Sequence, residues 1–145
     1  MKRVLLVTAC LFAMFIAAYA DAREATVVEL EWMIDAKDYD GVKGLLDAGI
    51  EDMNEADSSG NTVLHYAVQA GEKDIAGLLV DRGVDINAKN NDGMTALHIA
   101  ASKGNAGIVK LLLDKGADVT IKNKAGNTPA MAAKNDEIKK LFAKK

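Results

Sequence analysis

Apolar residues recur with helical spacing in pairs of short segments, and glycines separate the segments. In the clearest pair, Leu97, Ala100 and Ala101 fall at i, i+3 and i+4, which places them on one face of a short helix. Gly104 follows this segment and favours the left-handed turn that ends many helices. The next segment, 108–113, is apolar on most of its circumference and predicts a second helix that is buried on more than one side.

This pattern returns every 33 residues, which is typical of a repeat protein. Two full units cover 57–89 and 90–122, and two degenerate units flank them over about 26–56 and 123–142. A stack of about three units already buries a core, so four units predict one all-α domain over 21–145. Glycine, threonine and alanine keep the phase in three units, as Gly60, Gly93 and Gly126, Thr62, Thr95 and Thr128, and Ala67, Ala100 and Ala133.

Each full unit begins with a turn, such as Asn91-Asp92-Gly93, and Thr95 then stands where a helix N-cap is expected. The segments TALHIAA at 95–101, IVKLLL at 108–113 and GADV at 116–119 closely resemble the ankyrin repeat. Both full units lack the proline that usually follows the threonine in this family. The resemblance implies an ankyrin-repeat solenoid of about four helix-turn-helix repeats with short β-hairpin loops.

The resemblance also implies a non-enzymatic protein-protein interaction module, because ankyrin stacks present an extended concave surface to a protein partner. We expect the contact residues at exposed positions that break the 33-residue phase, since these are free to serve recognition. They are Ser58, Ser59, Asn61, Gln69, Ala70, Asn91, Asp92, Met94, Ser102, Lys103, Lys124, Ala125 and Asn127. We expect a monomer. The alternative is an accessory, stress-protection or immunity subunit that stabilises or neutralises one particular exported enzyme.

His65 and His98 occupy the same phase of successive units, which indicates a structural role and not a metal or catalytic one. The resemblance implies that each packs and hydrogen-bonds near the adjacent hairpin. A zinc site needs three or four converging ligands, and the acidic stretch 51–57 has Asp57 where a calcium loop requires glycine. We therefore expect no metal and no cofactor. Trp32 shares the phase of a position that the family buries, so we expect it in the core and not at a binding site.

The first residues have the three parts of a secretory signal peptide. Lys2 and Arg3 precede an apolar run over 4–18, and Ala18-Tyr19-Ala20 forms a small-x-small cleavage site before Asp21. We predict a signal peptide over 1–20, and hence a small exported protein of bacterial type that is periplasmic or secreted. The alternative is a membrane anchor formed by residues 4–20, which lies at the short limit for a spanning helix.

Charge and residue content exclude other functions. Removal of Lys2 and Arg3 leaves 16 basic against 21 acidic residues, a net charge of −5 that disfavours nucleic-acid binding. The mature chain has no cysteine, because the single one lies in the apolar leader, and we expect it not to bind a membrane after cleavage of the signal peptide. Its serines do not lie in a nucleophile motif, and no glycine-rich phosphate loop occurs. We therefore expect no enzymatic activity.

Overall fold

The structure is a computed structural model that describes residues 22–47 and 53–144. Within these residues the regular secondary structure is helical. The helices are α2 (Ala22–Asp35), α3 (Tyr39–Asp47), α4 (Val63–Ala70), α5 (Lys73–Asp81), α6 (Ala96–Lys103), α7 (Ala106–Asp114) and α8 (Asp136–Ala143).

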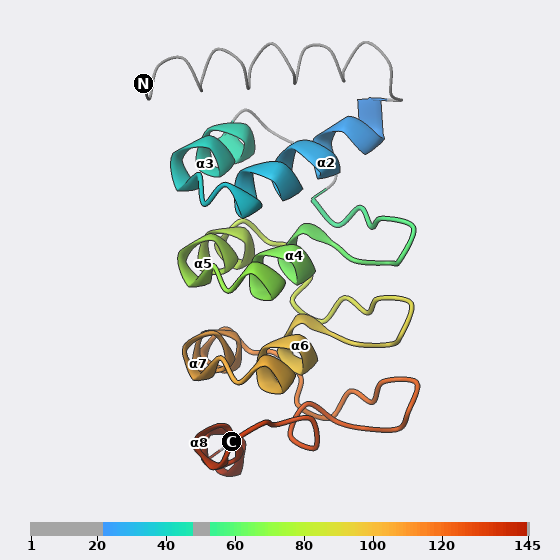
Figure 1. Cartoon of the computed structure of the whole chain (residues 1–145), viewed down its shortest axis with the longest axis vertical. Helices are drawn as coiled ribbons and strands as arrows, with labels where there is room; N and C mark the ends of the chain where they lie inside the picture. Colours follow the sequence, from blue (N-terminus) through green and yellow to red (C-terminus); the bar gives the residue numbers. More distant parts are fainter. Residues whose placement is uncertain (1–21, 48–52, 145) are drawn as a thin grey trace.

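The helices form two parallel layers that run the length of the stack (Figure 1). The inner layer contains α2, α4 and α6 and adjoins the hairpin loops, whereas the outer layer contains α3, α5, α7 and α8. α2 contacts α4 and α4 contacts α6 along the inner layer, and each of these helices also contacts the outer helix of its own unit. The core lies between the layers, where Leu64, Leu97, Ile108 and Leu112 are all buried.

Local sequence explains where the helices begin and end. Thr62 and Thr95 have extended backbone conformations directly before α4 and α6, which confirms the predicted N-caps. Gly71 and Gly104 end these helices with φ of +81° for both, a conformation that glycine adopts without a steric penalty. Asn105 caps α7, because its side chain accepts a hydrogen bond from the backbone N–H of Ile108 at 3.1 Å.

The hairpin loops form as predicted, but without regular strands in the described residues. In the third unit, the N–H of Asn90 donates to the carbonyl of Met94 at 3.0 Å and the N–H of Gly93 donates to the carbonyl of Asn90 at 2.8 Å. Only an isolated bridge between Ala56 and Thr62 has β-ladder geometry within this part of the chain. The loops are therefore tight turns on short extended arms.

The fourth unit differs from the prediction of a helix-turn-helix pair. Its only described helix is α8, and turns replace the inner helix over 129–132. The cause is a deletion of three residues, because Thr128 and Asn135 are seven positions apart whereas Thr95 and Asn105 are ten apart. Since α6 has eight residues, the shortened segment can hold about five, too few for a stable helix.

The prediction that Trp32 lies in the core is wrong, because 51% of its surface is exposed. Its neighbours Leu30 and Ile34 are buried, so the helix has the expected register. In the second unit the equivalent residue, Tyr66, is partly covered because it contacts Asp57 in the hairpin of its own unit. The described residues contain no hairpin before α2, so a residue at this position of the first unit has no such cover.

The predicted signal peptide over 1–20 and the alternative anchor over 4–20 lie outside the described residues. Among the helices that are described, none combines the length and the apolar character needed to cross a bilayer.

Candidate protein-binding surface

The predicted contact residues gather on two parts of the inner layer. One group lies on the hairpin loops over 57–61, 90–94 and 123–127, and the other lies on the last turns of α4 and α6. We call the exposed residues of the hairpins and of α2, α4 and α6 the inner surface. Asn61 and Met94 are half-buried, and the other predicted contact residues are exposed.

One polar side chain at the start of each hairpin fixes its shape. The Asn90 Oδ1 atom accepts hydrogen bonds from the N–H groups of Asp92 and Met94, both at 3.0 Å. Asp57 and Asn123 do the same in the preceding and following units. These internal bonds hold the loop tips in one conformation, so the exposed residues are presented from a rigid frame.

Successive hairpins are also joined to one another. The backbone N–H of Asn91 donates to the carbonyl of Ser59, and its side chain donates to the carbonyl of Ser58, both at 2.9 Å. The N–H of Lys124 donates to the carbonyl of Asp92 at 2.9 Å in the next pair. Some predicted contact residues therefore also stabilise the stack. The side chain of Asn91 donates a hydrogen bond to the preceding hairpin, and the side chain of Asn61 accepts one from the side chain of Asn90.

His65 connects the inner helix of one unit to the hairpin of the next. Its Nδ1 atom accepts from the backbone N–H of Thr62 at 3.0 Å, and its Nε2 atom lies 3.0 Å from the carbonyl oxygen of Met94. Nε2 therefore carries the proton and donates to the carbonyl. Burial lowers the pKa of His65, although the bond to Met94 and the charge of Asp57 oppose this shift.

His98 repeats the arrangement one unit later. Its Nδ1 atom accepts from the N–H of Thr95 at 3.2 Å, and its Nε2 atom lies 3.0 Å from the carbonyl oxygen of Asn127. Burial again lowers the pKa, and the nearby charge of Lys89 acts in the same direction. The structural role predicted for both histidines is confirmed by these bonds.

Acidic residues cluster where α2 meets the second unit. The Tyr66 hydroxyl donates to Asp57. Desolvation acts to raise the pKa of Asp57, but hydrogen bonds from Tyr66 and from the backbone of Asn61 and Ser59 hold it below its usual value. The pKa of Glu31 is raised, first by desolvation and then by the negative charges of Asp35 and Asp57. This end of the inner surface is therefore strongly acidic.

The sequence prediction missed three exposed lysines on or beside the inner surface. Lys89 and Lys122 lie on the arms of successive hairpins, and the Lys89 Nζ atom donates to the carbonyl of Lys122 at 3.2 Å. They keep the 33-residue phase, so a prediction built on positions that break the phase does not include them. Lys134 lies against Gly104, where an added Cβ would approach its Cδ to 3.3 Å. The deletion in the fourth unit concealed its position.

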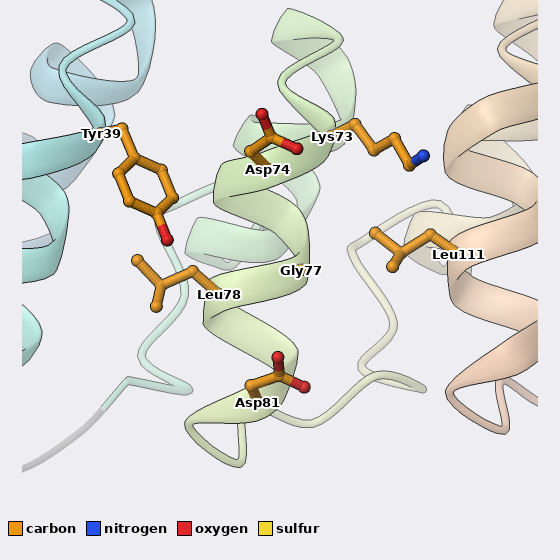
Figure 2. Close-up of a pocket in the computed structure, with 7 residues that line it drawn as sticks. All are labelled: Tyr39, Lys73, Asp74, Gly77, Leu78, Asp81 and Leu111. Carbon is orange, nitrogen blue, oxygen red and sulfur yellow. The ribbon is translucent and has the colours of Figure 1, made fainter.

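A second candidate site is an open depression of about 390 Å³ on the outer layer (Figure 2). Tyr39 of α3 and Leu111 of α7 flank α5, which contributes the remaining lining residues. Gly77, which has no side chain, is one of these lining residues on α5 (Figure 2). The lining of the depression mixes charges of both signs without a converging set, and no group of three or more metal-ligating side chains occurs within the described part of the chain.

Comparisons with known proteins agree with the repeat pattern. The family model described as "Ankyrin repeats (3 copies)" matches residues 30–123. A similar solved structure is the ankyrin repeat domain of Bcl-3, described as a unique member of the IkappaB protein family, with 29% identity and a TM-score of 0.75. The match covers 79% of this chain and 50% of the Bcl-3 chain, so it spans half the length of that domain. No curated protein sequence matches the chain.

The family match includes both full units and most of the first unit, and it ends at residue 123, where the fourth unit begins. Ankyrin repeats are protein-protein interaction modules and are generally non-enzymatic. In the first three units the helix pairs are arranged as the sequence resemblance implied, and so are the histidine bonds from the second and third units to the next hairpin. The chain belongs to the ankyrin-repeat family.

Proposed function

We propose that this chain is a non-enzymatic binding module that holds a protein partner on its inner surface. The observation that supports this proposal is the hydrogen bonding within and between the hairpins, such as the bond from Asn91 to Ser59. A rigid frame of this kind lowers the entropy lost on binding, because the contact residues are already held in place. The exposed residues are small or polar, so the partner is bound through many modest contacts.

We further propose that the module acts outside the cytoplasm. The support is the order of a basic start, an apolar run and the site Ala18-Tyr19-Ala20 in the sequence. The intact mass of protein recovered from the exported fraction tests this, and cleavage after Ala20 gives a chain that begins at Asp21. A species that retains Met1 and resists carbonate extraction from membranes would instead support an anchored protein.

Capture experiments with the full chain, tagged at the C-terminus, test the binding surface. The variant Gln69→Arg/Asp92→Arg/Ser102→Arg changes three exposed residues of the inner surface. The control Asp114→Arg/Glu137→Arg changes exposed residues of the outer helices α7 and α8 and adds the same total charge. A true partner is retained by the wild type and the control and is lost from the inner-surface variant. Equal retention by all three proteins would exclude the inner surface.

If the captured partner is an exported enzyme whose activity or stability changes on binding, the module is an accessory or immunity subunit. This outcome refines the proposed function, because the same surface would be used.

A further inference from the structure

Net charge changes sign along the stack. The unit 26–56 has nine acidic and two basic residues, 57–89 has five and three, 90–122 has three and four, and 123–145 has two and six. The net charges of successive units are therefore −7, −2, +1 and +4. Because the units are stacked in this order, the molecule is acidic at one end and basic at the other (Figure 1).

The hairpins of the inner surface show the same trend. Each hairpin carries two charged residues, and the sign changes from one loop to the next. They are Glu55 and Asp57 on the first described hairpin, Lys89 and Asp92 on the next, and Lys122 and Lys124 on the last. The side chains at the six positions are exposed or half-buried, so their charges face solvent.

The inner helices follow the hairpins in this respect. Glu31 and Asp35 make α2 acidic, the last turn of α4 is uncharged, and α6 ends in Lys103, with Lys134 in the segment beside it. On both the hairpin side and the helix side of the inner surface, the charge therefore changes from negative near α2 to positive near the last hairpin.

These inner charges are not neutralised by ion pairs within the described residues. Three of the four ion pairs lie on or between outer helices, for example Asp47 with Arg82 and Asp81 with Lys115. The fourth joins Lys37 to Glu72 in the turns that lead to outer helices. The lysines of the last hairpin and the carboxylates near α2 therefore keep their charges for a partner, although Asp57 also accepts hydrogen bonds within its own unit.

We propose that the inner surface binds a flexible protein segment with two blocks of opposite charge. The acidic block lies over the lysines of the last two hairpins, and the basic block lies over α2 and the first described hairpin. This inference rests on the proposed function and adds the chemistry and orientation of the partner. Complementary charge steers association, whereas the reversed orientation places like charges together and is disfavoured.

Synthetic peptides test the charge order directly. One peptide has a block of arginines, a Gly/Ser spacer and a block of glutamates, and a second has the same composition with alternating charges. We expect the segregated peptide to bind the full chain about tenfold more tightly in fluorescence anisotropy, with the difference lost at high salt. A paramagnetic label at the glutamate end should broaden the amide signals of residues 122–126, whichever terminus carries the glutamates.

Matched variants separate the inner surface from overall charge. Lys89→Glu/Lys122→Glu/Lys124→Glu should weaken binding of the segregated peptide by about tenfold or more. The control Lys110→Glu/Lys139→Glu/Lys140→Glu changes total charge equally, but on α7 and α8. It should weaken binding by less than about threefold, because these residues are remote from the peptide. Melting curves confirm that both variants fold.

Three results would overturn the inference. They are equal affinity for segregated and alternating peptides, equal loss in the two triple variants, and antiparallel self-association of the chain that excludes the peptide. If a protein partner is still captured through the inner surface in any of these cases, the proposed function stands and only the charge order is wrong. Capture that does not depend on the inner surface would reject the proposed function itself.

Discussion

The Nε2 atom of His65 lies 3.0 Å from the carbonyl oxygen of Met94, a residue in the hairpin of the next unit. The opposite ring nitrogen accepts the N–H of Thr62. Only a neutral imidazole can donate from one nitrogen and accept at the other. The contact between units therefore depends on the protonation state of the ring, and His98 makes the same contact with Asn127.

We expect the stack to lose stability as the pH falls below about 6.5. Burial lowers the pKa of both histidines in the folded chain, so the unfolded chain binds protons first on acidification. Stability is full while both states are neutral and declines by up to about 1.4 kcal/mol per pH unit for each histidine. Urea unfolding at pH 7.5, 6.5 and 5.5, roughly the range over which histidine titrates, measures this decline.

The variant His65→Gln/His98→Gln provides the control. A glutamine side chain at the third helical position can accept the backbone N–H of the N-cap threonine, as the histidine does, but it does not titrate in this range. The variant should be less stable at neutral pH, since its shorter side chain gives up the bond to the next hairpin. Its stability should change little between pH 7.5 and 5.5, a range in which few carboxylates titrate. A decline as steep as in the wild type would assign the effect to other groups.

The repeated parts of the fold were predictable because their chemistry is local. The threonine caps, the glycine C-caps and the phase of His65 follow from residues within one unit. The departures arise where a unit lacks its usual neighbour or length. Trp32 is exposed because no described hairpin covers it, and the inner helix of the fourth unit is lost because three residues are missing.

The candidate surface was predicted less completely, for two physical reasons. A residue that breaks the 33-residue phase can still support the stack, as Asn91 does through its bond to Ser58. Conversely, residues that keep the phase can be exposed, as Lys89 and Lys122 are. The 33-residue phase distinguishes repeated positions from unique ones. Only the three-dimensional arrangement shows which side chains form bonds within the stack and which are exposed to solvent.

Gly77→Ala should stabilise the chain by about 0.5–1 kcal/mol, because alanine favours the helix interior. A Cβ at this position would lie 3.7 Å from the nearest atom of Leu111, an ordinary contact. A Cβ at Gly71 would also make only an ordinary contact, 3.8 Å from Nδ2 of Asn105, but Gly71 has φ of +81°, which strains any residue with a Cβ. That variant should be destabilised, by about 1 kcal/mol. Chemical denaturation of both variants measures the predicted opposite signs.

Lys37→Gly should raise the stability by about 0.5–1 kcal/mol. Lys37 occupies the position that Gly71 and Gly104 hold in the next two units, and it is the one described non-glycine residue with positive φ, at 57°. Glycine relieves this strain. Lys37→Ala is the control, since it removes the exposed ion pair with Glu72 but keeps the strained backbone. If both variants have the same unfolding free energy, strain at this position is negligible.

Leu112→Ala should destabilise the stack by about 2–5 kcal/mol, because it leaves a cavity in the core. Leu112 is fully buried in α7, which contacts α5 on one side and α8 on the other. The loss of this packing should also make the unfolding of both flanking units less cooperative, since each repeat is stabilised by its neighbours. A shift below about 1 kcal/mol in denaturant melts would show that α7 is not central to the core.

The inner surface should separate into residues that stabilise the stack and residues that are free to bind. Asn91→Glu/Met94→Arg should lower the unfolding free energy by about 1–3 kcal/mol. The first change removes the hydrogen bond to the carbonyl of Ser58, and the second places a charge at a side chain that packs against the core.

Asp92→Arg/Lys103→Glu should change the unfolding free energy by no more than about 0.5 kcal/mol. Both residues are exposed, and their side chains form no hydrogen bond or ion pair within the described residues. Their net change in charge is zero, so the overall field of the protein is preserved. If Asp92→Arg/Lys103→Glu reduces partner binding while the melting curve stays in place, recognition and stability are carried by different side chains of the same hairpins. Equal destabilisation by the two double variants would mean that the hairpin tips act only as structural supports.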